Sequence, residues 1–591
     1  MSLWYLGSTR LTKPASAILV LISVGLVALG CAPSSSRPQS SSGAPTDIAS
    51  APAPRVLRMG MISSSEPTQS ITFASSAGGG EHPFMLHGAL TVYDAEGTLQ
   101  PHLAQSLPTL ENGDWKVMPD GRMEVTWKLR RDVRWHDGTP LTAADFVFGS
   151  QVIQDREMPI ARPRALAFMS EVVALDDSTV LVRWRQTYVF ANVSGAEGGG
   201  ILPAVPRHLL ADLYTPATKQ DFVNAPYWTR EFIGLGPYRL TDWVLGSQME
   251  LAAVDGYFLG RPKVDRVVVR YMGDVNALVA SLLAGDIDMT TMGAMKAEQL
   301  VTVKNAWEPA GLGTAYGEFN GARNYRFQYR DSTAPWAQDV RVRRALIHML
   351  DRQTLADTLI YGMTRPADTL PPTDDPVYAL VEQKGLAKYP YDLARAQRLL
   401  GEAGWEKGPD GSYRSARAES AGAPLGLEVR TSSKTDNVRE GQALAGEWKA
   451  AGLNTSTAVV PDSAANKDEL KAIFPGVLGW PIDYTPEALQ DWITTQIPTA
   501  SGGWRGRNFG GYTNPQFDAL YDQLLVTLEA PRRDAIYADM LKMSADDALS
   551  IFLYYDMQTN TVAHRKGVLG ITKTSANQRI NAWNIQTWTL E

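Results

Sequence analysis

Regular alternation of apolar and polar residues marks several short segments as strands with one buried face. The clearest lie at 55–60 (RVLRMG), 122–129 (RMEVTWKL) and 179–184 (TVLVRW). Further strands are predicted at 242–253, 264–271, 286–289 and 425–430. Since two of these segments fall between about 93 and 200, that part of the chain is predicted to be β-rich.

Amphipathic segments with capping signals predict helices between these strands. Thr142 stands three residues ahead of Asp145, which is close to a capping box. Further helices are predicted at 276–284 (ending at Gly285), 339–350, 392–403 and 437–451, and one more begins near Pro486. From about residue 320 onward, the mixture of helices and strands indicates an α/β fold. We find no internal repeat with a period of 20–50 residues.

The N-terminus has the three zones of an export signal. Arg10 and Lys13 precede the uncharged run Ala15–Leu29, which is shorter than the roughly 20 residues that span a bilayer. Ala28-Leu29-Gly30-Cys31 follows and resembles a bacterial lipoprotein signal, in which the chain is cut before a lipidated cysteine. The usual order is Leu-Ala-Gly-Cys, and the alternative is a secretory signal with an incidental cysteine. We expect a signal peptide at 1–30 and lipidation of Cys31.

Residues 31–54 are almost entirely Ala, Pro, Ser and Gly, a composition that cannot bury a core and predicts a disordered tether. Such a tether would reach about 25–30 Å. Cys31 is the only cysteine in the sequence, so the remainder forms no intramolecular disulfide and no thiolate metal site. No later run of 18 apolar residues is present.

Size and charge narrow the class of protein. Beyond the tether, about 537 residues remain, more than one hydrophobic core accommodates. The net charge is −7 and basic residues are spread along the chain, which excludes a concentrated nucleic-acid-binding face. The 16 Trp and 22 Tyr suit the walls of a ligand cleft, although core packing is the default for each one.

Signatures of enzymes are missing. We find no dinucleotide-binding glycine loop, no Walker A sequence and no G-x-S-x-G elbow. His82 and His87 are five residues apart, which does not match the i, i+4 spacing of a zinc-binding helix. Asp286 and Asp288 share one face of a predicted strand without an acid arrangement typical of glycosidases. We therefore expect no enzyme, no cofactor and no metal; turnover of a peptide or glycoside would instead indicate a secreted hydrolase.

Six segments together resemble the family 5 extracellular solute-binding proteins, the peptide, oligopeptide and nickel binders of ABC importers. In chain order, they are 119–145 (containing WKLRRDVRWHDGTPLTAAD), 234–238 (GLGPY), 284–288 (AGDID), 340–346 (VRVRRAL), 392–405 (DLARAQRLLGEAGW) and 512–518 (YTNPQFD). They extend over nearly the whole chain beyond the tether. The resemblance implies a structural role for His136, which lies in the Trp-His-Asp-Gly turn of the first segment.

The resemblance implies an α/β fold of the periplasmic-binding-protein-like type II class, with two lobes around a ligand cleft and an inserted β-rich domain. Lobe I would be discontinuous, from 55–92, 200–319 and 553–591. The inserted domain would occupy 93–199, and lobe II 320–552. Binding would close the two lobes by a hinge.

The resemblance also implies a ligand site on lobe II. Peptide binders of the family hold the ligand ammonium with the aspartate of a Trp-x-x-Asp segment, which matches Trp480 to Asp483 here, and Tyr484 could wall the same pocket. The alternative is that Asp483 caps the helix near Pro486. Oligopeptide binders can place an arginine shortly before this segment, but residues 474–478 (FPGVL) contain no base.

Two further stretches are candidates for ligand contact. The Gly-rich stretch 502–512 (GGWRGRNFGGY) offers Trp504, Arg505, Arg507 and Asn508; the alternative is a solvated loop. Gly80 and Glu81 lie where related binders offer a backbone edge to an extended peptide, or they belong to a loose surface loop.

The sequence thus predicts a membrane-anchored, extracytoplasmic lipoprotein, monomeric by family expectation, that delivers a small ligand to an ABC transporter permease. A peptide is the expected ligand. An oligosaccharide stacked on Trp480 and Trp504 is the main alternative. A nickel chelate or haem is less supported, and a sensor without its own permease stays open.

Overall fold

The computed structural model describes residues 53–62, 72, 82–160, 163–194, 200–557, 560–572 and 581–591. Residues 54–591 form one compact unit. The expected signal peptide, Cys31, nearly all of the tether, Gly80 and Glu81 lie outside the described residues. Within the described ranges, no helix has both the length and the apolar character needed to cross a membrane.

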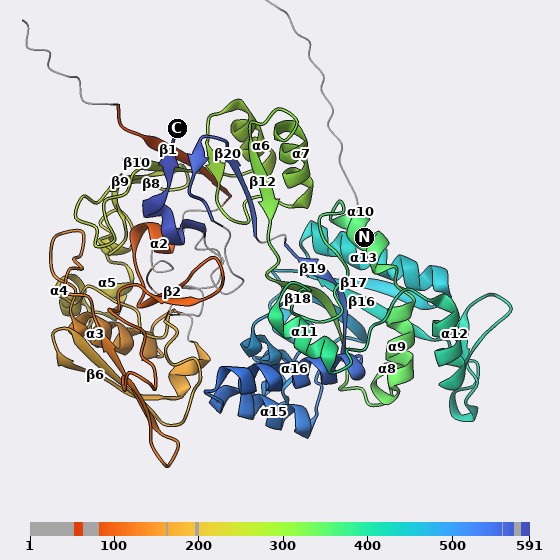
Figure 1. The fold of residues 1–591 in the computed structure, drawn as a ribbon. Helices are drawn as coiled ribbons and strands as arrows, with labels where there is room; N and C mark the ends of the chain where they lie inside the picture. The colour runs from red at the N-terminus through yellow and green to blue at the C-terminus, as the bar shows by residue number, and fades with distance from the viewer. Residues whose placement is uncertain are drawn as a thin grey trace, which may run out of the picture. The chain divides into compact units, whose positions relative to one another are not determined.

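A seven-stranded sheet has the order β12-β20-β11-β1-β10-β9-β8 (Figure 1). Its strands are β1 (Val56–Ile62), β8 (Tyr238–Val244), β9 (Gln248–Ala253), β10 (Arg266–Met272), β11 (Met289–Thr290), β12 (Gly313–Gly317) and β20 (Thr561–Arg565). Strand β1 runs parallel to both β10 and β11, and the other pairs are antiparallel. The strands predicted at 55–60, 242–253 and 264–271 are therefore confirmed, the second as two strands joined by a turn.

Helices α6 (Val275–Ala284) and α7 (Ala297–Trp307) pack against this sheet. Helix α6 confirms the helix predicted at 276–284. Gly285 ends α6 in the left-handed conformation, with φ 89°, which favours glycine. The strand predicted at 286–289 is wrong in extent, because β11 begins only at Met289. The Asp288 carboxylate instead accepts hydrogen bonds from the Arg58 backbone N–H (2.9 Å) and Nη2 (2.7 Å).

A four-stranded antiparallel sheet, in the order β4-β5-β7-β6, forms the β-rich block. It contains β4 (Trp115–Val117), β5 (Met123–Lys128), β6 (Met169–Asp176) and β7 (Thr179–Trp184), and β5 and β7 confirm the predicted strands. Helix α3 (Ala143–Gln154) packs on β6 and β7. Its capping box is confirmed, since the Asp145 carboxylate accepts from the Thr142 N–H at 2.9 Å.

His136 fastens this block to the loop before β8. Its Nε2 donates to the Gly236 carbonyl at 3.0 Å, and its Nδ1 accepts from the Gly234 N–H at 3.1 Å. Burial lowers the pKa of His136 to about 4, so the imidazole stays neutral. A Cβ on Gly234 would lie 1.8 Å from the Leu86 carbonyl oxygen, so this contact requires glycine.

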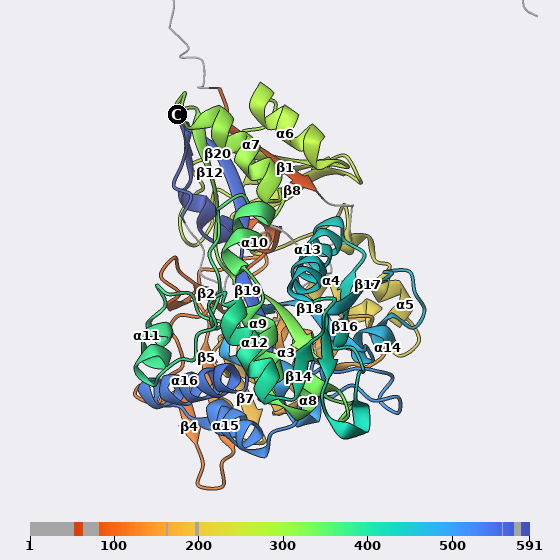
Figure 2. The same ribbon diagram turned by 90° about the vertical axis from the view of Figure 1, so that its right-hand side faces the viewer.

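A five-stranded sheet has the order β17-β16-β18-β13-β19 (Figures 1 and 2). Its strands are β13 (Gly321–Phe327), β16 (Gly426–Ser432), β17 (Asn454–Val460), β18 (Gly476–Asp483) and β19 (Ser550–Asp556). Strand β16 is parallel to β17 and β18, whereas β13 is antiparallel to β18 and β19. Four strands therefore end at the edge where β13 begins.

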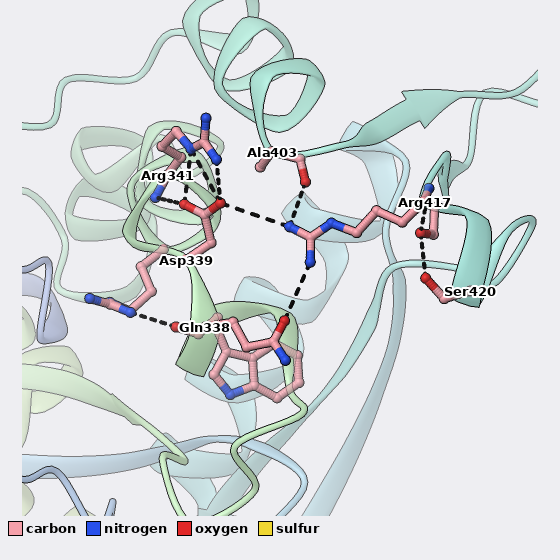
Figure 3. A network of polar contacts seen from close by, with 9 residues as sticks. Gln338, Asp339, Arg341, Ala403, Arg417 and Ser420 are labelled. Atoms are coloured by element: carbon pink, nitrogen blue, oxygen red, sulfur yellow. Dashed lines mark hydrogen bonds and ion pairs between the residues drawn. The ribbon is translucent and has the colours of Figure 1, made fainter.

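The helices predicted around this sheet are confirmed as α9 (Val340–His348), α12 (Leu393–Glu402) and α13 (Thr435–Ala451). Asp339 caps α9, accepting from the Arg341 N–H at 2.8 Å. Arg417 joins the same network through its ion pair with Asp339 (3.9 Å) and also donates to the Ala403 carbonyl at 2.9 Å (Figure 3). Helices α15 (Pro515–Val526) and α16 (Ala530–Asp546) pack together (Figures 1 and 2).

Shorter elements complete the described part of the chain. The helices are α2 (His82–Leu86), α4 (Arg207–Leu210), α5 (Lys219–Val223), α8 (Pro335–Gln338), α10 (Arg352–Leu359), α11 (Pro376–Gln383) and α14 (Lys467–Ala472). The strands are β2 (Thr91–Tyr93), β3 (Leu99–Pro101), β14 (Trp405–Lys407), β15 (Tyr413–Ser415), β21 (Val568–Leu569) and β22 (Thr589–Leu590).

The chain passes between the seven- and five-stranded sheets after β12 and again after β19. The two connections are hydrogen-bonded to each other, from the Glu318 N–H to the Asn560 carbonyl (3.2 Å) and from the Asn320 N–H to the Asp556 carbonyl (3.1 Å). The boundary expected between 552 and 553 falls inside β19, so the second crossing follows Asp556. Both crossings join the five-stranded sheet at the same edge, where β13 begins and β16 to β19 end.

Candidate functional site

Asp483 is the last residue of β18 and pairs with Gly321, the first residue of β13. It therefore lies at the carboxyl edge of the five-stranded sheet, beside the crossings to the seven-stranded sheet. In open α/β sheets, ligands bind outside the carboxyl ends of the strands. The fold thus places Asp483 where a ligand site is expected.

The alternative role of Asp483 as a helix cap is not what the structure shows. The helix near Pro486 is a 3-10 helix, η5 (Pro486–Trp492), and Thr485 occupies its cap position without a side-chain cap bond. Asp483 belongs to the strand instead, two residues before that cap.

Trp480 and Tyr484 lie beside Asp483 in the chain, and both are partly buried. The Trp480 ring packs edge-on against Phe509, with centroids 5.3 Å apart. The Tyr484 carbonyl accepts a hydrogen bond from the Tyr537 hydroxyl at 2.8 Å, which ties this turn to α16. The end of β18 therefore carries an acid, Asp483, with the half-buried Tyr484 next to it, while the Trp480 ring projects from the opposite face of the strand.

A buried carboxylate lies between two arginines further along the same sheet, where Arg326 of β13 pairs with Leu478 of β18. Asp491 is fully buried, and its oxygens lie 2.5 Å from Arg326 Nη2 and 2.5 Å from Arg507 Nε. The Arg326 side chain is 2% exposed, whereas that of Arg507 is 47% exposed. The three groups together carry a net charge of +1, and its accessible part is the Arg507 guanidinium.

Arg507 is also within electrostatic range of Asp483. Burial lowers the pKa of Arg507, but the ion pair with Asp491 and, more weakly, the charge of Asp483 raise it above its ordinary value. The site therefore combines one accessible cation with one nearby anion. Such a pair of charges complements a ligand that carries both an ammonium and a carboxylate.

The loop that carries Arg507 is fixed from several sides. Arg326 Nη1 donates to the Arg507 carbonyl at 2.7 Å. Arg330 donates to the carbonyls of Phe509 (2.7 Å) and Pro498 (2.8 Å). Guanidinium groups therefore hold the backbone of this segment at three carbonyls, although Arg505 and Arg507 remain exposed to solvent.

The remaining candidates in this loop differ in role. Asn508 is fully buried, and its amide donates to the Ile493 (3.1 Å) and Tyr512 (2.8 Å) carbonyls and accepts from the Tyr512 N–H (3.2 Å). Its polar atoms thus serve the fold, and we leave Asn508 out of the proposed ligand contacts. Trp504 is partly buried, with φ 58°, and Arg505 is exposed.

The sequence interpretation missed Arg326 and Asp491. The signal was the strand 321–327 (GARNYRF), which carries two arginines although it lies in the middle of a sheet. A buried guanidinium needs an acidic partner. Arg323 has one in Glu440, with Nη2 2.7 Å from Oε1, and Arg326 has one in Asp491.

No group of three or more His, Cys, Asp and Glu side chains suited to hold a metal ion occurs in the part of the chain that the structure describes.

Sequence comparison identifies the class of protein. Residues 98–496 match the profile of the bacterial extracellular solute-binding proteins, family 5 Middle. The chain belongs to this family, whose members are non-enzymatic binding proteins of ABC transporters. It is accordingly a solute-binding protein of an ABC importer, from an extracellular or periplasmic family, with a mixed α/β fold of the type II class.

Individual relatives agree with this assignment. Protein XP55 of Streptomyces lividans is 30% identical over 478 residues, covering 78% of this chain and 77% of the relative. The oligopeptide-binding protein AppA of Bacillus subtilis is 25% identical over 518 residues, 86% of each chain. The crystal structure of NikA from Brucella suis in complex with Fe(III)-EDTA superimposes with a TM-score of 0.71 at 22% identity, covering 90% of this chain and 100% of that one.

Proposed function

We propose that this protein captures a peptide between its two lobes and delivers it to an ABC transporter permease. The observation that carries the proposal is the placement of Asp483 at the carboxyl edge of the five-stranded sheet, near the accessible guanidinium of Arg507. A peptide in its zwitterionic form has an ammonium for Asp483 and a carboxylate for Arg507. The relationship to an oligopeptide-binding protein supports the same ligand class.

Binding in this proposal is a closure of lobe I (55–92, 200–319 and 557–591) on lobe II (320–556), about the two connections that follow β12 and β19. Trp480 and Tyr484 wall the ligand on lobe II. Gly80 and Glu81, which the sequence nominates for a contact with the ligand backbone, lie outside the described residues. The inserted domain (93–199) is carried with lobe I, to which His136 fastens it.

We further propose that the protein is a lipoprotein held at the membrane through Cys31. The uncharged run and the small residues ahead of that cysteine support this, as does the Ala-, Pro- and Ser-rich stretch after it. Acyl chains on one cysteine would anchor the protein firmly, since stable anchoring takes more than one chain. Replacement of Cys31 by serine should move the protein from the membrane to the soluble fraction; retention at the membrane would contradict the proposal.

Native mass spectrometry of the unit that begins at Pro54, purified gently from its own cells, tests the ligand class. We expect bound peptide masses. Asp483→Ala should abolish them, because truncating one partner of a buried charge pair costs roughly 2–5 kcal/mol. Asp410→Ala, at an exposed turn, is the matched control and should retain the same masses. Hexose-spaced masses that depend on Trp480 and Trp504 would replace the peptide by an oligosaccharide.

A further inference from the structure

One loop of the inserted domain reaches across to lobe II. This bridging loop, residues 185–194 (RQTYVFANVS), follows β7. The Val189 N–H donates to the Leu525 carbonyl of α15 at 2.9 Å. Leu525 is among the last four residues of α15, whose carbonyl groups have no partner within the helix. The inserted domain therefore supplies a hydrogen-bond donor to the end of a lobe II helix.

The bridging loop is held at both ends by residues outside lobe II. Near its start, the Thr187 hydroxyl donates to the Gly121 carbonyl at 3.0 Å. At its end, the Ser194 N–H donates to the Thr91 hydroxyl oxygen at 2.9 Å. Because both ends are fixed, the middle of the loop meets α15 in a defined conformation.

Two aromatic side chains of the bridging loop bury apolar surface between the two parts. Tyr188 and Phe190 are half-buried, with ring centroids 5.8 Å apart, and both pack against the lobe II core cluster that contains Leu524 and Leu525. Tyr188 also stacks on Trp184 of β7, with 5.4 Å between centroids. A short aromatic row thus connects the core of the inserted domain with that of lobe II.

Lobe II contributes side chains to the same contact. Leu528, which follows α15, is half-buried and packs against the core cluster that contains Trp184. Tyr93 of the inserted domain lies within electrostatic range of Glu487 (η5) and Arg533 (α16): burial raises the pKa of Tyr93, the charge of Glu487 acts in the same direction, and that of Arg533 opposes it. The inserted domain therefore faces η5, α15 and α16.

These contacts are made by elements other than the two connections that follow β12 and β19. An opening rotation of lobe II about those connections would break the hydrogen bond from Val189 and expose Phe190 and Leu528 to water. The contact is small, because its aromatic side chains are only half-buried. A hinge motion can therefore make and break it.

We propose that the bridging loop is a latch of the closed protein: its middle, residues 188–190, docks on the end of α15 when the lobes close on a ligand and separates from it when they open. Apparent affinity falls with the fraction of protein in the binding-competent form. Phe190 and Leu528 are thus positioning residues that act on ligand retention through closure. This inference rests on the lobe closure proposed above and is independent of the class of ligand.

Hydrogen–deuterium exchange read by mass spectrometry tests the latch, because the bond to Leu525 protects the Val189 amide. The unit that begins at Pro54 is compared as purified, with its ligand, and after the ligand has been removed by urea unfolding, dialysis and refolding. Overlapping peptides isolate the exchange of the Val189 amide. We expect this amide to exchange about tenfold faster after ligand removal, since the open form is then more populated.

A double variant tests the side chains of the latch. Phe190→Ser/Leu528→Ser removes one half-buried apolar side chain from each side of the contact. In the ligand-free protein, it should speed exchange of the Val189 amide about tenfold over the wild type. The control Leu110→Ser/Ile473→Ser changes an exposed apolar residue in each of the same two parts and should exchange like the wild type. Far-UV circular dichroism checks that each variant is folded.

Each other outcome is decisive. Equal exchange of the Val189 amide in the loaded and ligand-free wild type would indicate a permanent interface and overturn the latch, and this comparison needs no variant. Equal exchange in the folded double variant and the wild type would overturn the role of Phe190 and Leu528. If no ligand mass accompanies the purified protein, the capture proposal fails; faster exchange in the ligand-free double variant would then still support the contact, and equal exchange would overturn it.

Discussion

Replacing Asp491 by asparagine removes the single carboxylate between two guanidinium groups. In the wild type, Asp491 lies 2.5 Å from both Arg326 Nη2 and Arg507 Nε, and the cluster has a net charge of +1. In Asp491→Asn the same cluster would carry +2. Arg326 cannot move to water, because its side chain is 2% exposed and its Nη1 is held by the Arg507 carbonyl.

The expected cost follows from the burial of each partner. Removing one partner of a buried ion pair costs about 3–5 kcal/mol, because the other charge is left buried without compensation. The Arg507 side chain is 47% exposed, so water replaces much of its half of the interaction. The asparagine oxygen can still accept one hydrogen bond. We therefore expect a loss near the lower end, about 3 kcal/mol, which is a large part of a typical stability of 5–15 kcal/mol.

Urea unfolding of the ligand-free unit that begins at Pro54, followed by tryptophan fluorescence and far-UV circular dichroism, measures this loss. The midpoint should fall while the slope stays constant, since the exposed surface is unchanged. Asp120→Asn, which breaks the exposed Arg122–Asp120 pair, is the control and should leave the midpoint unchanged. A midpoint for Asp491→Asn equal to that of the wild type would refute the reasoning. Asp491→Leu combined with Arg326→Met should recover stability, because an apolar pair can replace a buried ion pair.

Two further predictions concern stability. Gly234→Ala should destabilise the protein by about 1–3 kcal/mol or more, since the new Cβ would meet the Leu86 carbonyl at 1.8 Å. Gly256→Ala, with nothing within 4 Å of its Cβ, should not, and equal unfolding midpoints for the two variants would contradict the contact. Burial lowers the pKa of His87 to about 3, far below the unfolded value of about 6.5, so the native state binds fewer protons. Above pH 6.5, the neutral His87 does not reduce the free energy of unfolding. As the pH falls from 6.5 toward 3, this free energy decreases because only the unfolded state binds the proton, and the loss is about 2 kcal/mol by pH 5. Between pH 7.5 and pH 5, the urea midpoint should fall less steeply with pH in His87→Gln than in the wild type. The same decrease in both proteins would exclude His87 as a source of the pH dependence.

Local patterns in the sequence were sufficient to locate most secondary structure. Alternation placed β5 and β7, and the glycine after Ala284 marked the end of α6. These signals are local, since they depend on residues a few positions apart. The strand expected at 286–289 is shorter in the structure, where β11 begins at Met289, and the partner of the Asp288 carboxylate is Arg58, 230 residues away in the chain. No local pattern contains such a partner.

The candidate site also combines features that local sequence patterns predict with contacts between residues far apart in the chain. Asp483 was expected from its position after Trp480, but its place at the carboxyl edge depends on the pairing of β18 with β13 and β16. The pairing of Arg326 with Asp491 spans 165 residues, so sequence patterns could raise the need for an acidic partner without identifying it.

Strand β13 has a buried arginine on each of its faces. Residues alternate between the two faces of a strand, and Arg323 and Arg326 are three apart, so they project to opposite sides. Arg323 meets Glu440 of α13, and Arg326 meets Asp491. Each ion pair fixes a different element against the same central strand, and only the second extends to an accessible cation, Arg507. The buried pair therefore does more than neutralise a core arginine, because Asp491 also holds the accessible guanidinium of Arg507, which the charge of Asp483 reaches.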